Sequence, residues 1–352
     1  MFFSLKNSTK KCFGKLRIYG SKSESNRLLI LQTLFPGIEI KNISDSEDTK
    51  ILFNALSSES NKIDVNHAGT AMRFLTALFS SIPGRSIILT GSNRMQQRPI
   101  KILVDALNSL GANINYVNKN GFPPIKIIGR ELKDRKVFLE ADVSSQYISA
   151  LMLIAPSLKN GLEINLKKKI VSKPYVEMTK DLLNYFGVKI LQTKNKIEIK
   201  PLATIENKIR QVESDWSSAS YYFSIASLSE EAKISLKRFK PKSLQGDSIL
   251  VSIYKKLGVE TTFIKDEMII SKVQDFVLPK SISLNLNNSP DIAQTIAVSC
   301  FGLGVNCELS GLKTLKIKET DRLIALKNEL EKLGADVNVT KDSISVNSQN
   351  SI

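Results

Sequence analysis

The sequence is poor in the residues that hold transition metals. It contains one histidine, His67, and three cysteines, Cys12, Cys300 and Cys307, among 352 residues. Zinc sites are built from several such ligands, and no C-x-x-C pair is present, so we expect no bound metal. Cys300 and Cys307 flank a glycine-bearing apolar run, which predicts buried thiols. A Ser-His-Asp triad would have to use His67, and no nucleophile elbow accompanies it.

Long apolar runs are also missing. No stretch approaches the roughly 18 to 20 apolar residues that span a bilayer. The beginning of the chain, MFFSLKNSTKKCFG, is too polar for a signal peptide. We therefore expect a cytoplasmic protein with no membrane partner, and a monomer.

Acidic residues are outnumbered by basic ones. Fifty lysines and arginines against 34 aspartates and glutamates give a net charge of +16, which favours anionic ligands. The lysines are scattered, aromatic residues make up 7%, and no RRM, KH or zinc-finger pattern occurs. Nucleic acid is therefore not the expected partner, although the charge keeps it as a minor alternative. A steep salt dependence of oligonucleotide affinity would support that alternative.

One kind of predicted helix recurs along the chain and ends in a glycine turn that leads into a strand. The segments are ILVDALNSLGANINY, MTKDLLNYFGVKIL, ILVSIYKKLGVETTF and LIALKNELEKLGADVNV. Their glycines are Gly111, Gly187, Gly258 and Gly334, spaced 76, 71 and 76 residues apart. Each stands where a helix usually ends in a left-handed residue, so we expect a positive φ at these four positions.

A second kind of helix alternates with the first and begins with small or hydroxyl residues. Starts at Gly69, Ser144, Ser217 and Ser289 are 75, 73 and 72 residues apart, and a shortened first copy begins near Ser25. Each helix is followed by a short strand. The helices are apolar nearly all round, which predicts that they are buried. The chain thus holds five copies of an α/β unit, with helices inside and strands outside.

The segment YGSKSESNRLLIL combines serines, Lys22 and Arg27 at the start of an apolar helix. Free N–H groups at a helix N-terminus bind anions, so we expect a negatively charged ligand here. A nucleotide phosphate loop would require glycine directly before the lysine, and Ser21 stands there instead. The anion is therefore not expected to be a nucleotide.

Seven blocks occur in the order found in one enzyme family. They are GSKSESNR, AGTAMR, LTGSNRMQQRPI, SSQYISAL, SKPYVEM, SPDIAQTIA and KETDR. From about Lys15 to Asp336 the chain resembles 5-enolpyruvylshikimate-3-phosphate (EPSP) synthase, also called 3-phosphoshikimate 1-carboxyvinyltransferase. One block alone would be weak evidence, whereas the ordered set is specific.

The resemblance implies a two-domain, inside-out α/β barrel of the enolpyruvyl transferase type. It is built from βαβαββ-like repeats, of which five of six are present. One domain is expected at residues 20–212 and holds three repeats on the shikimate 3-phosphate side. The other combines residues 1–19 with 213–352 and lacks its last repeat, which leaves an uncovered apolar flank. The active site of the family lies in the cleft between the domains.

The implied reaction transfers the enolpyruvyl group of phosphoenolpyruvate to the 5-hydroxyl of shikimate 3-phosphate and releases phosphate, a step of aromatic amino acid biosynthesis. The two small molecules are the expected partners, and no metal or organic cofactor is implied. By resemblance, shikimate 3-phosphate is bound by Lys22, Ser23, Arg27, Ser144, Ser145, Gln146, Ser172, Tyr175, Asp291 and Lys318. Phosphoenolpyruvate is bound by Lys22, Gly69, Thr70, Arg98, Gln146 and Arg322.

Three residues carry the chemistry in this resemblance. Asp291 takes the proton of the 5-hydroxyl, Glu319 protonates the phosphoenolpyruvate methylene and later removes a methyl proton, and Lys22 is the cation shared by both substrates. Addition followed by elimination requires one proton-transfer group near the hydroxyl and a second near the methylene. Taken alone, KETDR would equally describe an ordinary ion pair at a helix start.

The sequence departs from the family pattern in three places. Phe74 follows AGTAMR where the family has proline, which should alter packing beside the ligand and beside inhibitors that mimic phosphoenolpyruvate. An asparagine expected before KETDR is replaced, with Thr314 near its place. The Asp-His-Arg-Met block and a later lysine block, which supply two cations to phosphoenolpyruvate, are not found. Charge-assisted hydrogen bonds contribute about 1.5–3 kcal/mol each, so their loss should weaken binding.

Two other functions stay open at this point. A truncated or non-catalytic remnant would bind shikimate 3-phosphate through Arg27 and Ser144 without releasing phosphate. The related UDP-N-acetylglucosamine enolpyruvyl transferase would need a cysteine in the RMQQRP region, and none is there.

Overall fold

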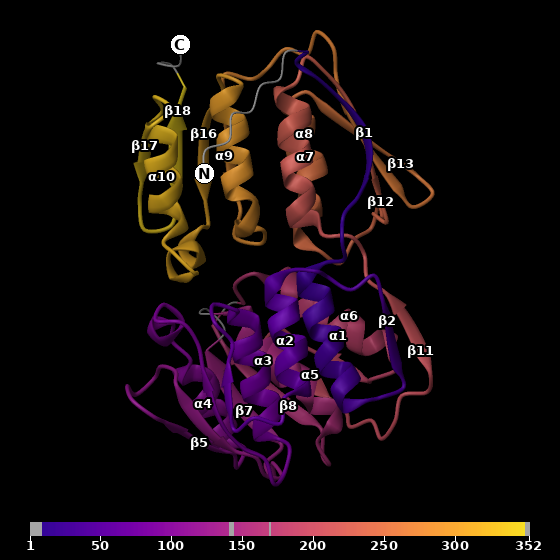
Figure 1. Ribbon diagram of the computed structural model, residues 1–352, viewed down its shortest axis with the longest axis vertical. Helices are drawn as coiled ribbons and strands as arrows, with labels where there is room; N and C mark the ends of the chain where they lie inside the picture. Colours follow the sequence, from indigo (N-terminus) through magenta and orange to yellow (C-terminus); the bar gives the residue numbers. More distant parts are fainter. Residues whose placement is uncertain (1–8, 141–143, 169, 349–352) are drawn as a thin grey trace. The chain divides into compact units, whose positions relative to one another are not determined.

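The chain forms two compact units in a computed structural model that describes residues 9–140, 144–168 and 170–348 (Figure 1). We call Tyr19–Val212 with Lys316–Asp321 the inserted unit. The terminal unit comprises the described residues of Met1–Ile18, Glu213–Leu315 and Arg322–Ile352. Residues 1–8 and 349–352, which the sequence assigned to the second domain, lie outside the described residues. No described helix is both long and apolar enough to cross a membrane.

The inserted unit contains two complete βαβαββ repeats. The first has β3 (Lys62–Asp64), α3 (Gly69–Ser80), β4 (Ser86–Thr90), η1 (Met95–Gln97), α4 (Lys101–Ser109), β5 (Asn113–Tyr116) and β6 (Ile125–Ile128). The second has β7 (Lys136–Glu140), α5 (Ser145–Ile154), η2 (Ala155–Ser157), β8 (Leu162–Lys167), α6 (Lys173–Tyr185), β9 (Ile190–Gln192) and β10 (Lys196–Ile199). Each repeat forms its own sheet, in the orders β3-β4-β6-β5 and β7-β8-β10-β9. The first strand pair of each sheet is parallel and the other two are antiparallel.

A shortened repeat completes the inserted unit. It has α1 (Lys22–Leu34), β2 (Ile38–Lys41) and α2 (Glu47–Ser57). Its missing first strand is supplied by β11 (Lys208–Gln211), which pairs in parallel with β2. The chain therefore closes this unit with a strand that lies about 170 residues later, just before it crosses into the terminal unit.

The terminal unit repeats the same design. One repeat has β1 (Lys11–Arg17), α7 (Trp216–Leu228), β12 (Glu231–Lys237), η3 (Gly246–Ile249), α8 (Leu250–Lys255), β13 (Val259–Ile264) and β14 (Glu267–Lys272). The next has β15 (Ser281–Asn285), η4 (Pro290–Ile292), α9 (Ala293–Gly302), β16 (Asn306–Ser310), η5 (Lys313–Ile317), α10 (Arg322–Glu331), β17 (Asp336–Val339) and β18 (Ile344–Asn347). The sheets have the orders β1-β12-β14-β13 and β15-β16-β18-β17. β1 pairs in parallel with β12, so the beginning of the chain belongs to this unit.

The inner helices of the inserted unit are buried, as their uniformly apolar sequences predict. In α3 every residue except Thr70 is buried, and in α5 every residue except Gln146. The prediction of full burial is wrong for the terminal unit, where α7 exposes Tyr221 and Ile225 and α9 exposes Val298.

The four periodic glycines adopt the predicted conformation. Gly111, Gly187, Gly258 and Gly334 have φ values of 98°, 94°, 75° and 92° after α4, α6, α8 and α10. The left-handed region is accessible to glycine without steric cost, so these residues end the helices and turn the chain into the next strand.

Replacing Gly334 by alanine should lower the free energy of unfolding of the terminal unit by about 1–2 kcal/mol, because an L-residue pays that cost at positive φ. No atom lies within 4 Å of the added Cβ, so backbone strain alone is tested. Gly14→Ala is the matched control, since its Cβ is equally unobstructed and no positive φ applies. Urea unfolding followed by fluorescence of Trp216, the single tryptophan and a buried residue of this unit, measures both. Equal destabilisation by the two variants would contradict the assignment.

Candidate functional site

The inner helices of the inserted unit bring their N-termini together. Helices α1, α3 and α5 pack against one another in pairs. Gln146, the second residue of α5, donates from Nε2 to Oγ1 of Thr70, the second residue of α3, over 3.2 Å. These are the two residues that α5 and α3 leave unburied. Lys22, the first residue of α1, forms a 3.4 Å ion pair with Asp48 of α2. The unpaired N–H groups of helix N-termini and their positive dipole ends favour an anion.

Arg98 lies directly against the first residue of α3. A Cβ built on Gly69 would stand 2.5 Å from Nη1 and 2.6 Å from Nη2 of Arg98. Any side chain larger than hydrogen at position 69 would therefore displace the guanidinium. The glycine is required here for a close approach and not for its φ angle.

The Arg98 guanidinium is buried and incompletely hydrogen-bonded. The residue is 8% exposed, and within the described ranges its Nη1 atom has no hydrogen-bond partner. Burial and, to a lesser extent, the charge of Arg73 lower the pKa of Arg98 to about 10, and the carboxylate of Glu319 partly opposes the shift. Leaving a buried charged donor unsatisfied is costly, so this arrangement indicates a place for an anionic group.

Arg27 is also buried, but neutral acceptors surround it. Its Nε donates to Thr179 Oγ1 over 2.7 Å, Nη1 to the Ser23 carbonyl over 2.8 Å, and Nη2 to Ser149 Oγ and the Tyr175 carbonyl, each over 3.1 Å. Burial lowers its pKa to about 10, a shift that nearby Tyr175 and Glu24 oppose. Four of its five N–H groups are thus occupied. One donor on Nη1 is left for a ligand.

The remaining residues predicted on this side come from α5 and α6. Ser144 caps α5, its hydroxyl accepting from the Gln146 amide over 3.2 Å, and Ser145 is buried. Ser172 precedes α6 with a φ of 53° and makes no capping hydrogen bond. A serine in the left-handed region is strained, which is common where a side chain is presented to a ligand. Tyr175 lies beside Arg27, with the guanidinium 5.8 Å from its ring centre.

Phe74 lies on the other side of Arg27. Its ring is almost fully buried, and the Arg27 guanidinium lies 5.5 Å from the ring centre. The departure at this position was expected to affect the phosphoenolpyruvate side of the helix start. The structure instead places the aromatic ring against the arginine predicted to hold the shikimate carboxylate.

The KETDR segment is divided between the two units. Lys318 and Glu319 belong to the inserted unit, where Glu319 acts electrostatically on Arg98. In the terminal unit, Nη1 of Arg322 donates to Oδ1 of Asp291 over 2.9 Å. A residue predicted to bind phosphoenolpyruvate is therefore paired with the predicted base. The Thr314 hydroxyl, near the place of the family's asparagine, is buried, and no partner for it is found in the described part of the chain.

Two further arginines take part in this arrangement, and the sequence reasoning gave them no role. Arg73 donates from Nη1 to the Gly69 carbonyl over 3.3 Å and from Nη2 to the Pro99 carbonyl over 3.0 Å, which fixes the chain around Arg98. Arg94 donates to backbone carbonyls of the KETDR region. Arg73 belongs to the motif AGTAMR and Arg94 to the motif LTGSNRMQQRPI, and membership of these motifs was the only indication in the sequence that they take part.

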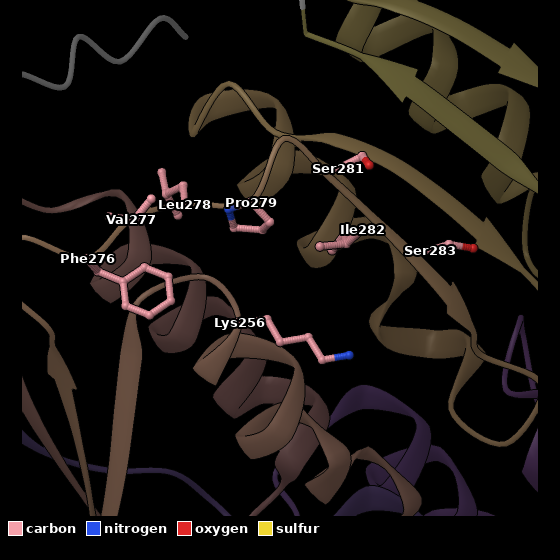
Figure 2. A pocket seen from close by; sticks show the side chains of 8 residues that line it. All are labelled: Lys256, Phe276, Val277, Leu278, Pro279, Ser281, Ile282 and Ser283. Atoms are coloured by element: carbon pink, nitrogen blue, oxygen red, sulfur yellow. The ribbon is translucent and has the colours of Figure 1, made fainter.

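A separate hollow of about 500 Å³ lies in the terminal unit (Figure 2). Its lining comes from the end of α8, the loop before β15 and β15 itself: Lys256, Phe276, Val277, Leu278, Pro279, Ser281, Ile282 and Ser283. None of these residues was predicted to bind substrate. Among the described residues, no group of three or more histidines, cysteines, aspartates and glutamates could hold a metal ion.

Comparisons with a family profile, with related sequences and with solved structures all match the same enzyme family. The family profile of EPSP synthase (3-phosphoshikimate 1-carboxyvinyltransferase) matches residues 53–351. A 3-phosphoshikimate 1-carboxyvinyltransferase of Bacteroides fragilis (strain YCH46) is 44% identical over 94% of this chain and 80% of its own. The enzyme of the same name from Buchnera aphidicola subsp. Cinara cedri is 37% identical over 95% and 82%. The structure of an EPSP synthase from Acinetobacter baumannii superposes with a TM-score of 0.73 at 21% identity, covering 96% of this chain and 82% of that one.

The repeats define a class of protein, an α/β protein built from βαβαββ units around inner helices. Within that class, the chain belongs to the EPSP synthase family. The predicted family and fold class are confirmed.

Arg98→Met should raise the free energy of unfolding by about 1–3 kcal/mol, because it removes a buried charge that is incompletely hydrogen-bonded. At neutral pH Arg98 is charged in the folded protein, so the destabilisation from burying it is fully present. The unmodified protein would regain this stability only as the pH rises above about 10, where the buried guanidinium loses its proton. Arg73→Met is the matched control and should lower stability, because its guanidinium is hydrogen-bonded. Thermal unfolding with and without inorganic phosphate measures both. A destabilised Arg98→Met protein that still gains stability from phosphate would contradict the site.

Proposed function

We propose that this protein transfers the enolpyruvyl group of phosphoenolpyruvate to the 5-hydroxyl of shikimate 3-phosphate and releases phosphate. The observation that carries the proposal is Arg98, a buried cation that lies on Gly69 at the N-terminus of α3 and whose Nη1 atom has no hydrogen-bond partner among the described residues. Such a site suits a dianionic phosphate. The family of the chain supplies the identity of the two substrates.

The α5 and α6 side of the inserted unit is proposed to bind shikimate 3-phosphate. Ser144, Ser145 and Gln146 would hold the 3-phosphate at the start of α5, with Ser172 from the strained turn before α6. The open donor of Arg27 and the hydroxyl of Ser23 would hold the carboxylate. Tyr175 would contact the ring, because its side chain already packs against Arg27. In this proposal Asp291 and Lys318 contact the ring hydroxyls.

The α3 side is proposed to bind phosphoenolpyruvate. Arg98 and the free N–H groups at Gly69 and Thr70 would receive the phosphate, and Gln146 is hydrogen-bonded to Thr70 at the boundary of the two ligands. Lys22 would neutralise both ligands, since its ion pair with Asp48 keeps the ammonium at this end of α1. Arg322 would contribute a further cation.

The proton transfers are proposed to use two carboxylates. Asp291 accepts the proton of the 5-hydroxyl while the oxygen attacks C2 of phosphoenolpyruvate, and Glu319 donates a proton to C3, which becomes a methyl group. The product is a tetrahedral ketal. Glu319 then removes a methyl proton, the C2–O bond to phosphate breaks, and the enol ether forms. Arg322 next to Asp291 favours the ionised carboxylate that acts as a base.

We further propose that the protein works as a cytoplasmic monomer. Its three cysteines are free thiols, two of them buried, which suits a reducing compartment. Sedimentation velocity of the purified chain would test the oligomeric state.

The central experiment is release of phosphate by the purified chain in the presence of both substrates. Glu319→Gln should lower kcat by about 10²- to 10⁴-fold, the usual effect of a general acid or base, while the Kd of shikimate 3-phosphate measured by calorimetry stays within about twofold. Glu329→Gln on the exposed face of α10 is the control and should leave kcat unchanged. If the unmodified chain binds shikimate 3-phosphate but releases no phosphate, the protein is a binding protein and not a synthase.

A further inference from the structure

A short part of the chain leaves the terminal unit and lies with the inserted unit. Residues Lys316–Asp321 belong to the inserted unit, whereas Leu315 before them and Arg322 after them belong to the terminal unit. We call Lys316–Asp321 the strap. It carries Glu319, the proposed proton donor, so the position of that carboxylate depends on what holds the strap.

Arg94 holds the strap by its backbone. Nε of Arg94 donates to the Lys318 carbonyl over 3.1 Å, and Nη2 donates to the Lys316 carbonyl over 3.3 Å. The two acceptors are two residues apart, and the second of them, the Lys318 carbonyl, belongs to the peptide bond that joins Lys318 to Glu319. A planar guanidinium with diverging donors can bridge two carbonyls in this way, whereas a lysine ammonium is a single point charge.

The turn that carries Arg94 is itself firmly held. Ser92 Oγ accepts from the Met95 amide over 3.3 Å, Gln96 Nε2 donates to the Gly91 carbonyl over 2.9 Å, and Met95 is fully buried. Arg98 follows one turn later, with its amide bonded to the Met95 carbonyl over 3.0 Å. One short rigid turn therefore presents Arg98 to the start of α3 and Arg94 to the strap.

We propose that Arg94 is a positioning residue, which fixes the strap so that the Glu319 carboxylate stays beside Arg98 and the start of α3. The proposal rests on the proposed function, because it assigns the purpose of the anchor to proton transfer by Glu319. The electrostatic influence of Glu319 on Arg98 supports the same arrangement. Arg94 needs no contact with substrate, since it acts through the backbone of the strap.

The kinetic test compares Arg94→Gln with the unmodified chain. Loss of the anchor misplaces the proton donor, so kcat should fall about 10- to 100-fold, while the Kd of shikimate 3-phosphate stays within about twofold. Arg94→Lys should recover only part of the loss. Arg85→Gln is the matched control, because Arg85 is also partly buried in the inserted unit and also donates to a loop carbonyl, that of Ser58, away from the site. It should leave kcat unchanged.

A second measurement tests, independently of activity, whether Arg94 holds the strap in place. Amide hydrogen exchange in a peptide covering the strap should become at least about threefold faster in Arg94→Gln and stay unchanged in Arg85→Gln. Unchanged exchange in Arg94→Gln overturns the anchor, and faster exchange with an unchanged kcat overturns its role in catalysis. If the unmodified chain releases no phosphate, the proposed function fails, and the exchange result alone then decides whether Arg94 fixes the strap.

Discussion

The inserted unit depends on the mutual burial of three inner helices. Helices α3 and α5 are apolar nearly all round, α1 is buried from Glu24 to Leu31, and the three helices pack against one another. In each βαβαββ repeat the inner helix follows the first strand, and a parallel first strand pair requires every such helix to run in the same sense. Their N-termini consequently meet at one end. The position proposed for an anion follows from the way the core is packed, because the N–H groups at the starts of α3 and α5 converge where Gln146 bonds to Thr70.

Two buried arginines, Arg27 and Arg98, lie beside these helix N-termini, and the burial of their charges lowers the stability of the fold. Nη1 of Arg98 has no hydrogen-bond partner among the described residues, and Arg27 donates only to neutral acceptors. A protein selected for stability alone would place apolar side chains at both positions. The two arginines differ in what they offer a ligand. Arg27 is hydrogen-bonded on four of its N–H groups, which would fix the orientation of a ligand at its one open donor. Arg98 lies on Gly69 with Nη1 unsatisfied, which suits the more strongly charged group.

Local and periodic features could be predicted from the sequence, and contacts between distant segments could not. The glycine period predicted the positive φ at Gly111, Gly187, Gly258 and Gly334, and the apolar runs predicted the burial of α3 and α5. The family and fold class followed from ordered motifs. The pairing of Asp291 with Arg322, the anchor at Arg94 and the place of Lys316–Asp321 in the inserted unit were not predicted. Each joins residues of different elements, and helical or strand periodicity carries no information about such pairs. The roles of the predicted site residues stay predictions.

Phe74, which replaces the family's proline after AGTAMR, affects the neighbouring residue Arg27. Position 74 lies inside α3. Proline there would lack the backbone N–H that a helical residue donates to the carbonyl four residues earlier. Phenylalanine restores that donor and places an aromatic ring 5.5 Å from the Arg27 guanidinium. A cation over a ring face is stabilised by the ring quadrupole, and more so when desolvated. Arg27 is thus held between the rings of Phe74 and Tyr175 as well as by four hydrogen bonds. A residue on α3, the helix proposed to bind phosphoenolpyruvate, therefore packs against the arginine on α1 that is proposed to bind shikimate 3-phosphate.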